Sequence, residues 1–340
     1  MSELQKTNPA FYTDMRHIII EAQRTAVRGA EYVRMMMYWH LGERIFVEEQ
    51  HGNNRAAYGE YTLNNLAKRL EAEFGSGFSK RQLERARLFY RVYPTESNLR
   101  KQLNWLQYRL LSSIDDDYKR EYYELEAANH GWTGRELERQ INSLLYERLL
   151  LSNDKEAVLA VARKERIPEK PAEIVKDPMF LEFLGLKREA PYYENDIESA
   201  LITHLQEFLL ELGNGFSFIA RQKRLLLEDD EFFADMVMYN RLLRCFVVIE
   251  IKTHKMTHAD IGQLQMYVNY FDRFEKLPDE NPTVGILLCT AKNDLLAKIT
   301  LPEDNTNILT SKYELYLPTE NELIEEIKEV MDLAEGEIQE

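Results

Sequence analysis

The stretch from Phe232 to Lys252, FFADMVMYNRLLRCFVVIEIK, constrains this chain most, because it sets three charged residues inside two apolar, β-branched segments. A tight turn at Leu242-Leu243 would join these segments as a β-hairpin. Asp235 and Glu250 lie equally far from that turn, so they are expected to be directly opposed, with Lys252 on the face of Glu250. Two carboxylates opposed at about 5 Å repel each other. A divalent cation between them would remove that conflict.

Oxygen ligands are the ones that Mg²⁺ prefers, usually one or two carboxylates with water and phosphate. Asp235, Glu250 and the backbone carbonyl of Ile251 could supply them. Lys252 would then orient or activate the attacking water, or stabilise the pentacovalent phosphate. The pattern therefore predicts a Mg²⁺ or Mn²⁺ site for phosphodiester hydrolysis. A buried structural ion-pair network is the alternative that the three residues alone leave open.

The net charge of −15 is distributed unevenly over the 340 residues. Residues 1–150 hold 22 Lys+Arg against 21 Asp+Glu, whereas residues 151–340 hold 21 against 37. Much of the deficit lies in the last segment, from Thr319, with nine acids and one lysine. Local patches set the field that a ligand meets, so the acidic total does not exclude DNA binding.

The two cysteines, Cys245 and Cys289, lie inside apolar runs and are expected to be buried thiols, not a disulfide framework or a zinc site. The N-terminal segment has no apolar core of a signal peptide, and no stretch approaches the roughly 18 apolar residues of a membrane span. A soluble, cytoplasmic protein is expected.

Helical periodicity fills the first 150 residues, and composition changes after a charged, proline-containing connector. An amphipathic helix, three β-rich segments, a helix and a further strand then follow, an order typical of α+β or α/β architecture. The expected division is a helical domain at 1–150, a linker at 151–176, an α/β domain at 177–318 and an acidic tail helix at 319–340.

A basic helix is predicted over residues 79–91, SKRQLERARLFYR, after a glycine-containing break. The spacing to the preceding helix is that of a helix-turn-helix element, whose second helix can enter a DNA groove. Arginines there could bind phosphates or guanine edges. A solvated face of a helical bundle is equally compatible with the pattern. The candidate nucleic-acid-binding residues are Lys80, Arg81, Arg85, Arg87 and Arg91.

With Asp235 fifteen residues before Glu250-Ile251-Lys252, the chain resembles the PD-(D/E)-x-K nuclease superfamily. More closely, it resembles the YhcG-like family, which joins an N-terminal helical domain of winged-helix type to such a nuclease core. Ala234 stands where the superfamily name has proline. The stretches that carry the resemblance are YWHLGERI (38–45), EFGSGFSKRQLERARLFY (73–90), GWTGRELERQI (131–141), FLGL (183–186) and the run 196–289.

The resemblance implies a restriction-endonuclease-like core with a mixed central sheet flanked by helices, and it adds further candidate site residues. Glu198 matches an acid that often contacts the metal through water, with Glu194 and Asp196 as competitors and a solvated helix-face acid as the alternative. Gln263 matches a residue that points at the metal or phosphate. Gln222 is a candidate for lining the substrate groove, with ordinary packing at a strand edge as the favoured alternative.

The expected function is a divalent-metal-dependent nuclease acting on DNA, in defence, restriction or DNA processing. Asp235, Glu250, Lys252 and Gln263 are the candidate catalytic residues. A homodimer and restriction or defence-system proteins are the expected partners, since one site per chain suits double-strand cleavage by two copies. The alternative is a non-catalytic nucleic-acid-binding or scaffold protein of a defence complex, with an inactive nuclease fold.

Overall fold

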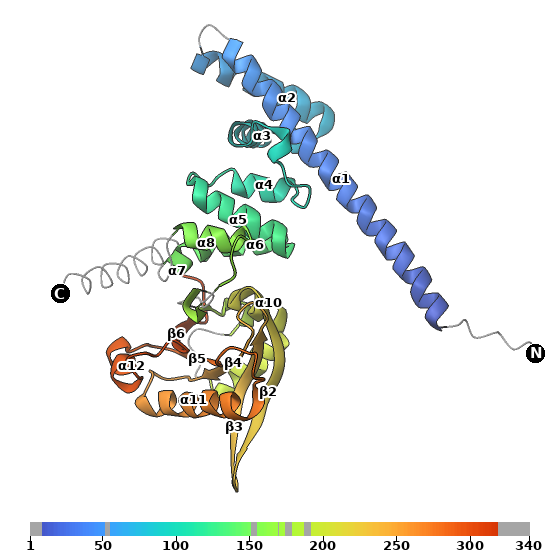
Figure 1. Ribbon diagram of the computed structural model, residues 1–340. Coiled ribbons are helices and arrows are strands. Elements are labelled where there is room, and N and C mark those ends of the chain that lie inside the picture. Colours follow the sequence, from blue (N-terminus) through green and yellow to red (C-terminus); the bar gives the residue numbers. More distant parts are fainter. Residues whose placement is uncertain are drawn as a thin grey trace, which may run out of the picture. The chain divides into compact units, whose positions relative to one another are not determined.

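The computed structural model describes residues 9–51, 55–150, 155–168, 170–173, 179–186 and 192–318 (Figure 1). Contacts divide the chain into two compact units, Met1–Glu138 and Arg139–Glu340. The division falls inside a helix, ahead of the domain end expected at residue 150. The predicted tail helix at 319–340 lies outside the described residues.

The described part of the first unit is helical throughout, as predicted. Residues 9–51 and 55–138 contain no strand, so the β-hairpin wing of a winged-helix domain is absent from them. A short 3-10 turn at Ser76–Phe78 separates the two helices of the predicted helix-turn-helix element. The helices are α1 (Pro9–His51), α2 (Arg55–Phe74), α3 (Lys80–Val92), α4 (Trp105–Leu111), α5 (Asp117–His130) and the start of α6 (Gly134–Asn142).

Helix α1 packs closely on α3 because Gly42 has no side chain. A Cβ at this position would lie 2.0 Å from the carbonyl oxygen of Ala86, which no real contact allows. The buried face of α3 includes Leu83, Ala86 and Phe89. Trp39 fixes the end of the same helix, since its indole Nε1 donates a 2.7 Å hydrogen bond to the carbonyl of Tyr93. The basic side chains of α3 are thereby held on the faces away from this core.

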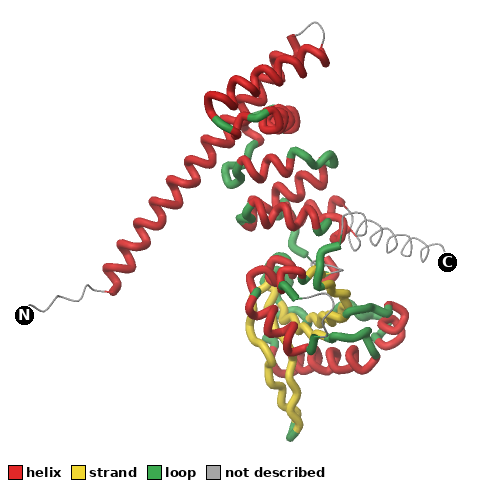
Figure 2. The backbone as a smooth tube through the Cα atoms, turned by 180° about the vertical axis from the view of Figure 1, so that it is seen from behind, coloured by secondary structure: helices red, strands yellow, loops and turns green. Residues whose placement is uncertain are grey.

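The N-terminal half of α1 extends away from the other helices of its unit (Figures 1 and 2). Ile18, Ile19, Val27 and Val33 are between 54% and 68% exposed. These four apolar side chains therefore add nothing to the apolar core of the first unit. None of the described helices is long and apolar enough to span a lipid bilayer.

The second unit contains a six-stranded mixed sheet in the order β1-β6-β5-β4-β3-β2, as expected for the predicted core. Strands β2, β3 and β4 are antiparallel, and β4, β5, β6 and β1 are parallel. The strands are β1 (Met179–Phe180), β2 (Phe216–Leu227), β3 (Asp230–Asn240), β4 (Cys245–Ile251), β5 (Val284–Cys289) and β6 (Ile308–Glu314). The helices are the end of α6, α7 (Leu145–Leu150), α8 (Lys155–Ala162), α9 (Glu194–Thr203), α10 (Leu205–Leu212), α11 (His258–Tyr270) and α12 (Asp294–Thr300).

Two apolar cores cover the two faces of this sheet. Val247 and Ile249 of β4 belong to the core that includes residues of α9 and α10. Val248 belongs to the other core, with residues of α11. Because strand side chains alternate, Glu250 lies on the α11 side of β4.

Two local expectations need correction. The predicted linker is not wholly irregular, because Lys155–Ala162 forms α8. The single amphipathic helix that the sequence predicts ahead of the three β-rich segments is two helices, α9 and α10, that meet at His204. Ser199 and Thr203 each donate a side-chain hydrogen bond to the carbonyl four residues earlier, a contact that often bends helices.

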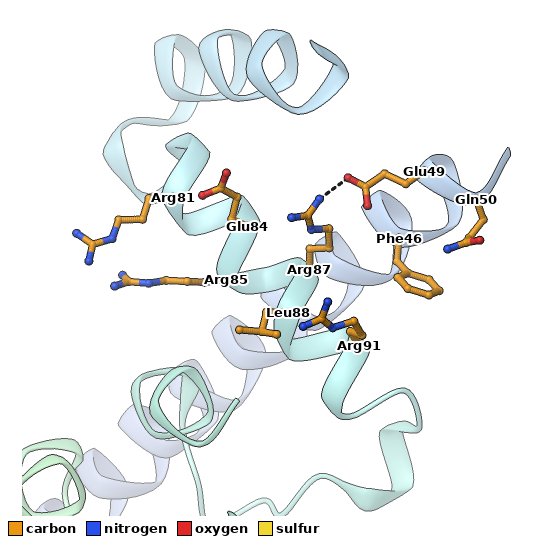
Figure 3. A pocket seen from close by; sticks show the side chains of 9 residues that line it. All are labelled: Phe46, Glu49, Gln50, Arg81, Glu84, Arg85, Arg87, Leu88 and Arg91. Atoms are coloured by element: carbon orange, nitrogen blue, oxygen red, sulfur yellow. Dashed lines mark hydrogen bonds and ion pairs between the residues drawn. The ribbon is translucent and has the colours of Figure 1, made fainter. Parts of the chain in front are cut away.

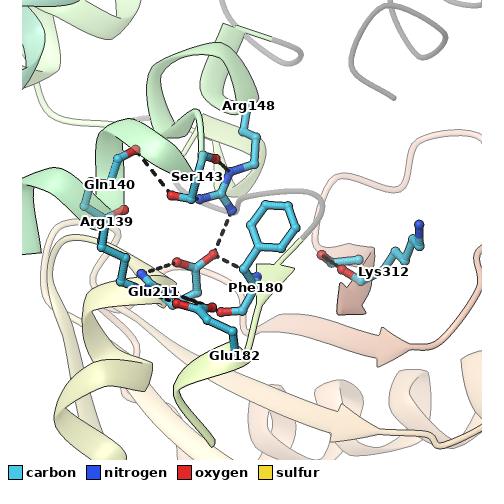
Figure 4. Close-up of polar contacts among 9 residues, drawn as sticks. Arg139, Gln140, Ser143, Arg148, Phe180, Glu182, Glu211 and Lys312 are labelled. Atoms are coloured by element: carbon cyan, nitrogen blue, oxygen red, sulfur yellow. Dashed lines mark hydrogen bonds and ion pairs between the residues drawn. The ribbon is translucent and has the colours of Figure 1, made fainter. Parts of the chain in front are cut away.

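A buried cluster of charged residues ties α6 and α7 to the sheet of the second unit (Figure 4). Glu211 of α10 has no exposed surface and accepts hydrogen bonds from Arg148 Nη1 at 2.7 Å and Arg139 Nη1 at 3.0 Å. It also accepts the backbone N–H of Phe180 in β1 at 3.1 Å. Arg139 binds Glu182 as well. These contacts explain why the second unit begins at Arg139, since α6 and α7 supply the two arginines that bind Glu211.

Candidate active site

The β3–β4 hairpin has the register that its sequence predicts. Met236 pairs with Ile249 and Asn240 with Cys245, which places the turn at Leu242-Leu243. The same register sets Asp235 opposite Glu250. A side chain also joins the two strands there, because Asp235 Oδ2 accepts the backbone N–H of Ile251 at 2.8 Å.

All three charged residues of the hairpin are buried. Asp235 is 7% exposed, Glu250 1% and Lys252 8%. Lys252 Nζ lies 2.8 Å from Glu250 Oε1 and 3.6 Å from Glu194 Oε2 of α9. The lysine thus neutralises one of the two opposed carboxylates only in part, and a concentration of negative charge remains.

One carboxylate oxygen in this cluster lacks a hydrogen-bond partner. Glu250 Oε2 is fully buried, yet no donor of the described residues reaches it. A buried acceptor without a donor is costly, so it indicates strain or a missing ion or water. Within the described part of the chain, no group of three His, Cys, Asp or Glu side chains has the arrangement of a ready-made metal site. A cation here would therefore rely on two carboxylates and other oxygens.

Burial raises the pKa of both carboxyl groups. The pKa of Asp235 rises to about 6, although the hydrogen bond from Ile251 acts in the opposite direction. Burial and then the charge of Asp235 raise the pKa of Glu250 to about 7, more than Lys252 lowers it. Burial alone would lower the pKa of Lys252, but its hydrogen bond to Glu250 and the nearby acids outweigh burial and raise it. Lys252 is therefore a cation at neutral pH.

Helix α9 brings Glu198 to the same cluster. Glu198 is 1% exposed, so it is not the solvated acid of the alternative interpretation. Its Oε2 accepts hydrogen bonds from Arg221 Nε at 3.1 Å and Gln222 Nε2 at 2.7 Å. Of its two competitors, Asp196 accepts the N–H of Tyr193 at the helix start, whereas Glu194 reaches Lys252.

Gln222, a candidate for lining the substrate groove, is also a direct neighbour of Asp235 in the hairpin. Its Nε2 donates to Asp235 Oδ1 at 3.0 Å as well as to Glu198. Sequence reasoning also missed Arg221, the cation that faces Glu198. The RQKR run of β2 gave no signal to distinguish the residue that faces the acids from its neighbours.

Gln263 contacts a tyrosine next to the cluster. Among the described contacts it forms no hydrogen bond to Asp235 or Glu250. Its Nε2 donates to the hydroxyl of Tyr267 at 2.7 Å, and this hydroxyl donates to the carbonyl of Phe233 at 3.1 Å. Burial and the charges of Glu250 and Asp235 raise the pKa of Tyr267. Gln263 and Tyr267 therefore form an adjacent polar pair on α11.

The basic helix α3 lines a separate pocket of about 680 Å³ in the first unit (Figure 3). Arg81 and Arg85 extend to the same side of the helix, whereas Arg87 turns toward Glu49 of α1. Burial lowers the pKa of Arg85, and the positive charges of Arg109 and Arg81 lower it further. The residues that line the pocket are Phe46, Glu49, Gln50, Arg81, Glu84, Arg85, Arg87, Leu88 and Arg91.

The five predicted basic residues of α3 differ in whether a carboxylate already binds them. Arg87 Nη1 lies 2.6 Å from Glu49 Oε1, and Lys80 Nζ lies 3.9 Å from Glu84 Oε1. Arg81, Arg85 and Arg91 form no ion pair with another residue that the structure describes. These three arginines are therefore the ones free to meet an anionic ligand.

Asp235→Asn is expected to stabilise the metal-free protein at pH 8 by roughly 1–3 kcal/mol. Asparagine keeps an acceptor for the N–H of Ile251 and removes a buried charge, and this gain exceeds the loss of the acceptor for Gln222 Nε2. The folded-state pKa of Asp235, about 6, lies above the unfolded value of about 3.9. The contribution of this group to stability is therefore most favourable below about pH 4 and declines as pH rises through 6.

The measurement is urea denaturation in EDTA at pH 5 and pH 8, followed through hydrogen exchange in β4. The advantage of Asp235→Asn over the unaltered protein should grow from pH 5 to pH 8. Glu207→Gln, on the exposed face of α10, is the matched control and should stay within about 0.5 kcal/mol. An Asp235→Asn protein that loses stability at pH 8 would show that the carboxylate is satisfied without a metal.

Both the N-terminal and the C-terminal part of the chain match known protein families. Residues 172–329 match the family model of the YhcG PDDEXK nuclease domain, and residues 14–148 match the DUF1016 N-terminal domain. The chain is 35% identical over 343 residues to the Escherichia coli (strain K12) protein named "Putative nuclease YhcG", covering 92% of this chain and 91% of that protein.

Solved structures also show partial similarity. A repair endonuclease from Pyrococcus abyssi is 21% identical, with a TM-score of 0.27 over 37% of this chain and 50% of that one. EndoMS in complex with double-stranded DNA is 19% identical, with a TM-score of 0.26 over 39% and 50%. The match to the Escherichia coli protein along nearly the whole chain, with both family models in the same order, shows that this chain belongs to the YhcG family of PDDEXK-domain nucleases.

Proposed function

We propose that this protein is a divalent-metal-dependent endonuclease that hydrolyses phosphodiester bonds in DNA. The observation that carries the proposal is the buried pair of opposed carboxylates, Asp235 and Glu250, with Lys252 Nζ 2.8 Å from one of them. Structural ion pairs are normally satisfied when they are buried. Here two acids face a single lysine, and Glu250 Oε2 has no donor. An arrangement of this kind suits cation binding better than stability.

A Mg²⁺ or Mn²⁺ ion fits the oxygen donors of this site. Asp235, Glu250 and the carbonyl of Ile251 would hold it, and Glu198 would contact it through water. When bound, such an ion supplies a Lewis acid and lowers the pKa of water. The unpartnered Glu250 Oε2 supports the fit, since it offers a desolvated carboxylate oxygen that no described residue uses.

The side chains of the protein would perform the remaining tasks. Lys252 remains protonated because its carboxylate neighbours raise its pKa, so it would stabilise negative charge on the phosphate and would not remove a proton. Gln263 and Tyr267 would hold the α11 side of the site through their hydrogen bond. If both strands of a duplex are cut, two copies of the chain would act, because each contributes one such site.

The proposal is tested by incubating purified protein with supercoiled plasmid, linear duplex, single-stranded DNA and RNA, each with Mg²⁺, Mn²⁺ or EDTA. Cleavage of a DNA form that requires the metal is the expected result. Intact substrates under every condition would contradict the proposal and favour the non-catalytic scaffold. Cleavage of RNA alone would correct the substrate.

The free arginines of α3 would bind the phosphate backbone of DNA. Arg81→Ala combined with Arg85→Ala should weaken binding to DNA of any sequence and reduce the slope of log affinity against log salt by about 2, since each lost phosphate contact contributes about 1. Fluorescence anisotropy on a duplex from 50 to 200 mM salt measures this slope.

Arg87→Ala is the matched control for the double variant. It removes an arginine from the same helix, but one that Glu49 already binds at 2.6 Å. Its salt slope should remain closer to that of the unaltered protein. Equal slopes for the double variant and the unaltered protein would exclude α3 as the DNA-binding surface.

A further inference from the structure

Gln222 has a backbone conformation that is unusual for its place in a strand. Its φ is +47°, in the left-handed region that side chains other than glycine rarely adopt. Among the described non-glycine residues with positive φ, it alone lies inside a strand. The β2–β3 ladder pairs Arg221 with Met236 and Lys223 with Ala234, but Gln222 forms no ladder pair between them. A strained backbone conformation of this kind persists only where surrounding contacts fix it, and such positions are often functional sites.

The side chain of Gln222 provides the compensating contact. The two N–H groups of one carboxamide nitrogen are sufficient for two acceptors, and Nε2 lies 2.7 Å from Glu198 Oε2 and 3.0 Å from Asp235 Oδ1. These two acids are 1% and 7% exposed. A neutral donor thus joins two buried acids that would otherwise repel each other. Glu198 comes from α9 and Asp235 from β3, so Gln222 links two elements that the rest of the site must hold in register.

The geometry points to Gln222 as a positioning residue that holds Glu198 and Asp235 in place for a divalent cation. This inference rests on the proposed metal site but assigns a role outside its ligands. Each oxygen of an ionised carboxylate can accept more than one contact, so the hydrogen bond leaves Asp235 able to bind an ion. Mutation of a residue that orients a metal ligand through a hydrogen bond typically lowers metal affinity by 10- to 100-fold.

Two substitutions separate positioning from a merely structural role. Gln222→Met has nearly the same length and lacks the donor. Gln222→Asn keeps an amide and tolerates the left-handed conformation better, but it is one methylene too short to span the acids. If the backbone conformation alone matters, Gln222→Asn should be as stable as the unaltered protein and bind metal equally well. If the link between the acids matters, both variants should lose metal affinity.

The readout is Mn²⁺ binding at pH 7.5, measured by calorimetry and by the electron paramagnetic resonance signal of free Mn²⁺, with no substrate present. We expect about 10-fold weaker binding for both Gln222 variants. Glu228→Asn is the matched control, because Glu228 has φ +54° beside the same hairpin and no described contact with the site. It should bind Mn²⁺ like the unaltered protein. Circular dichroism and thermal unfolding confirm that each variant is folded.

The outcomes distinguish this inference from the proposed function. If Glu250→Gln abolishes Mn²⁺ binding and both Gln222 variants bind as tightly as the unaltered protein, Gln222 has no positioning role and the metal site stands. If the unaltered protein shows no Mn²⁺ binding that Glu250→Gln removes, the metal site and the role of Gln222 are both wrong. Weaker binding in both variants, with binding by Glu228→Asn unchanged, supports the assignment.

Discussion

Glu250→Gln is expected to slow phosphodiester cleavage by on the order of 100- to 1,000-fold while the protein stays folded. Glutamine has the same length and keeps an oxygen that can accept the hydrogen bond of Lys252 Nζ, which lies 2.8 Å from Glu250 Oε1. The substitution removes the negative charge and replaces the unpartnered Oε2 with a donor. Single-turnover cleavage of supercoiled plasmid in Mg²⁺ measures the loss.

Lys252→Met separates the charge of the lysine from its packing. The alkyl stem of methionine fills a similar volume, so a comparable loss of rate would assign the effect to the ammonium group. Glu228→Gln, in the β2–β3 turn and away from the site, should cleave at the normal rate. If Glu250→Gln cleaved as fast as the unaltered protein, the opposed carboxylates would be a structural ion-pair network, and the catalytic centre would lie elsewhere in the chain.

The central hairpin could be predicted from sequence because its pattern is local. Two apolar segments with period-two alternation fix their own register once the turn is placed, since a slip by one residue would expose the whole buried face. The opposition of Asp235 and Glu250 follows from that register alone. The start of α11 is equally local, because Thr257 and Asp260 form both hydrogen bonds of a capping box.

The contacts that complete the site were beyond the reach of local patterns. Whether Gln222 or Lys223 faces the acids depends on an irregularity in the β2–β3 ladder and on a positive φ, neither of which has a signature such as glycine. The ion pairs of α3 depend on its packing against α1, so sequence could not separate Arg87 from Arg85. Basic residues that look equivalent in the sequence therefore differ in their availability to a ligand.

The place where the chain passes from the contacts of the first unit to those of the second was hard to predict for the same reason. Residues 117–150 show continuous helical periodicity, which gives no sign that the chain changes partners within α6. The change is made by Arg139 and Arg148, which look like ordinary helix-surface residues in the sequence but contact Glu211 in the second unit. Only the three-dimensional position of Glu211, seventy-two residues after Arg139, identifies Arg148 as buried and Arg139 as partly buried.

Glu211→Ala is expected to destabilise the second unit by about 3–5 kcal/mol, the usual cost of removing one partner from a buried ion pair. Glu211 and Arg148 have no exposed side-chain surface, so water cannot replace the lost carboxylate. Arg139 would keep Glu182 as a partner, whereas Arg148 would lose this carboxylate and keep its hydrogen bonds to Ser143 and its contact with the ring of Phe180. Urea denaturation followed by hydrogen exchange in β4 and β5 measures the change within this unit.

Two further variants identify the cause of that loss. Glu207→Ala removes an acid from the exposed face of the same helix and should change stability by less than about 0.5 kcal/mol. Arg148→Met combined with Glu211→Ala removes the buried arginine charge together with its carboxylate partner, so the double variant should be more stable than Glu211→Ala alone. If the double variant is instead the less stable of the two, Arg148 stabilises the unit mainly through Ser143 and Phe180. A loss below about 1 kcal/mol for Glu211→Ala would mean that the cluster does not hold β1 and α10 together.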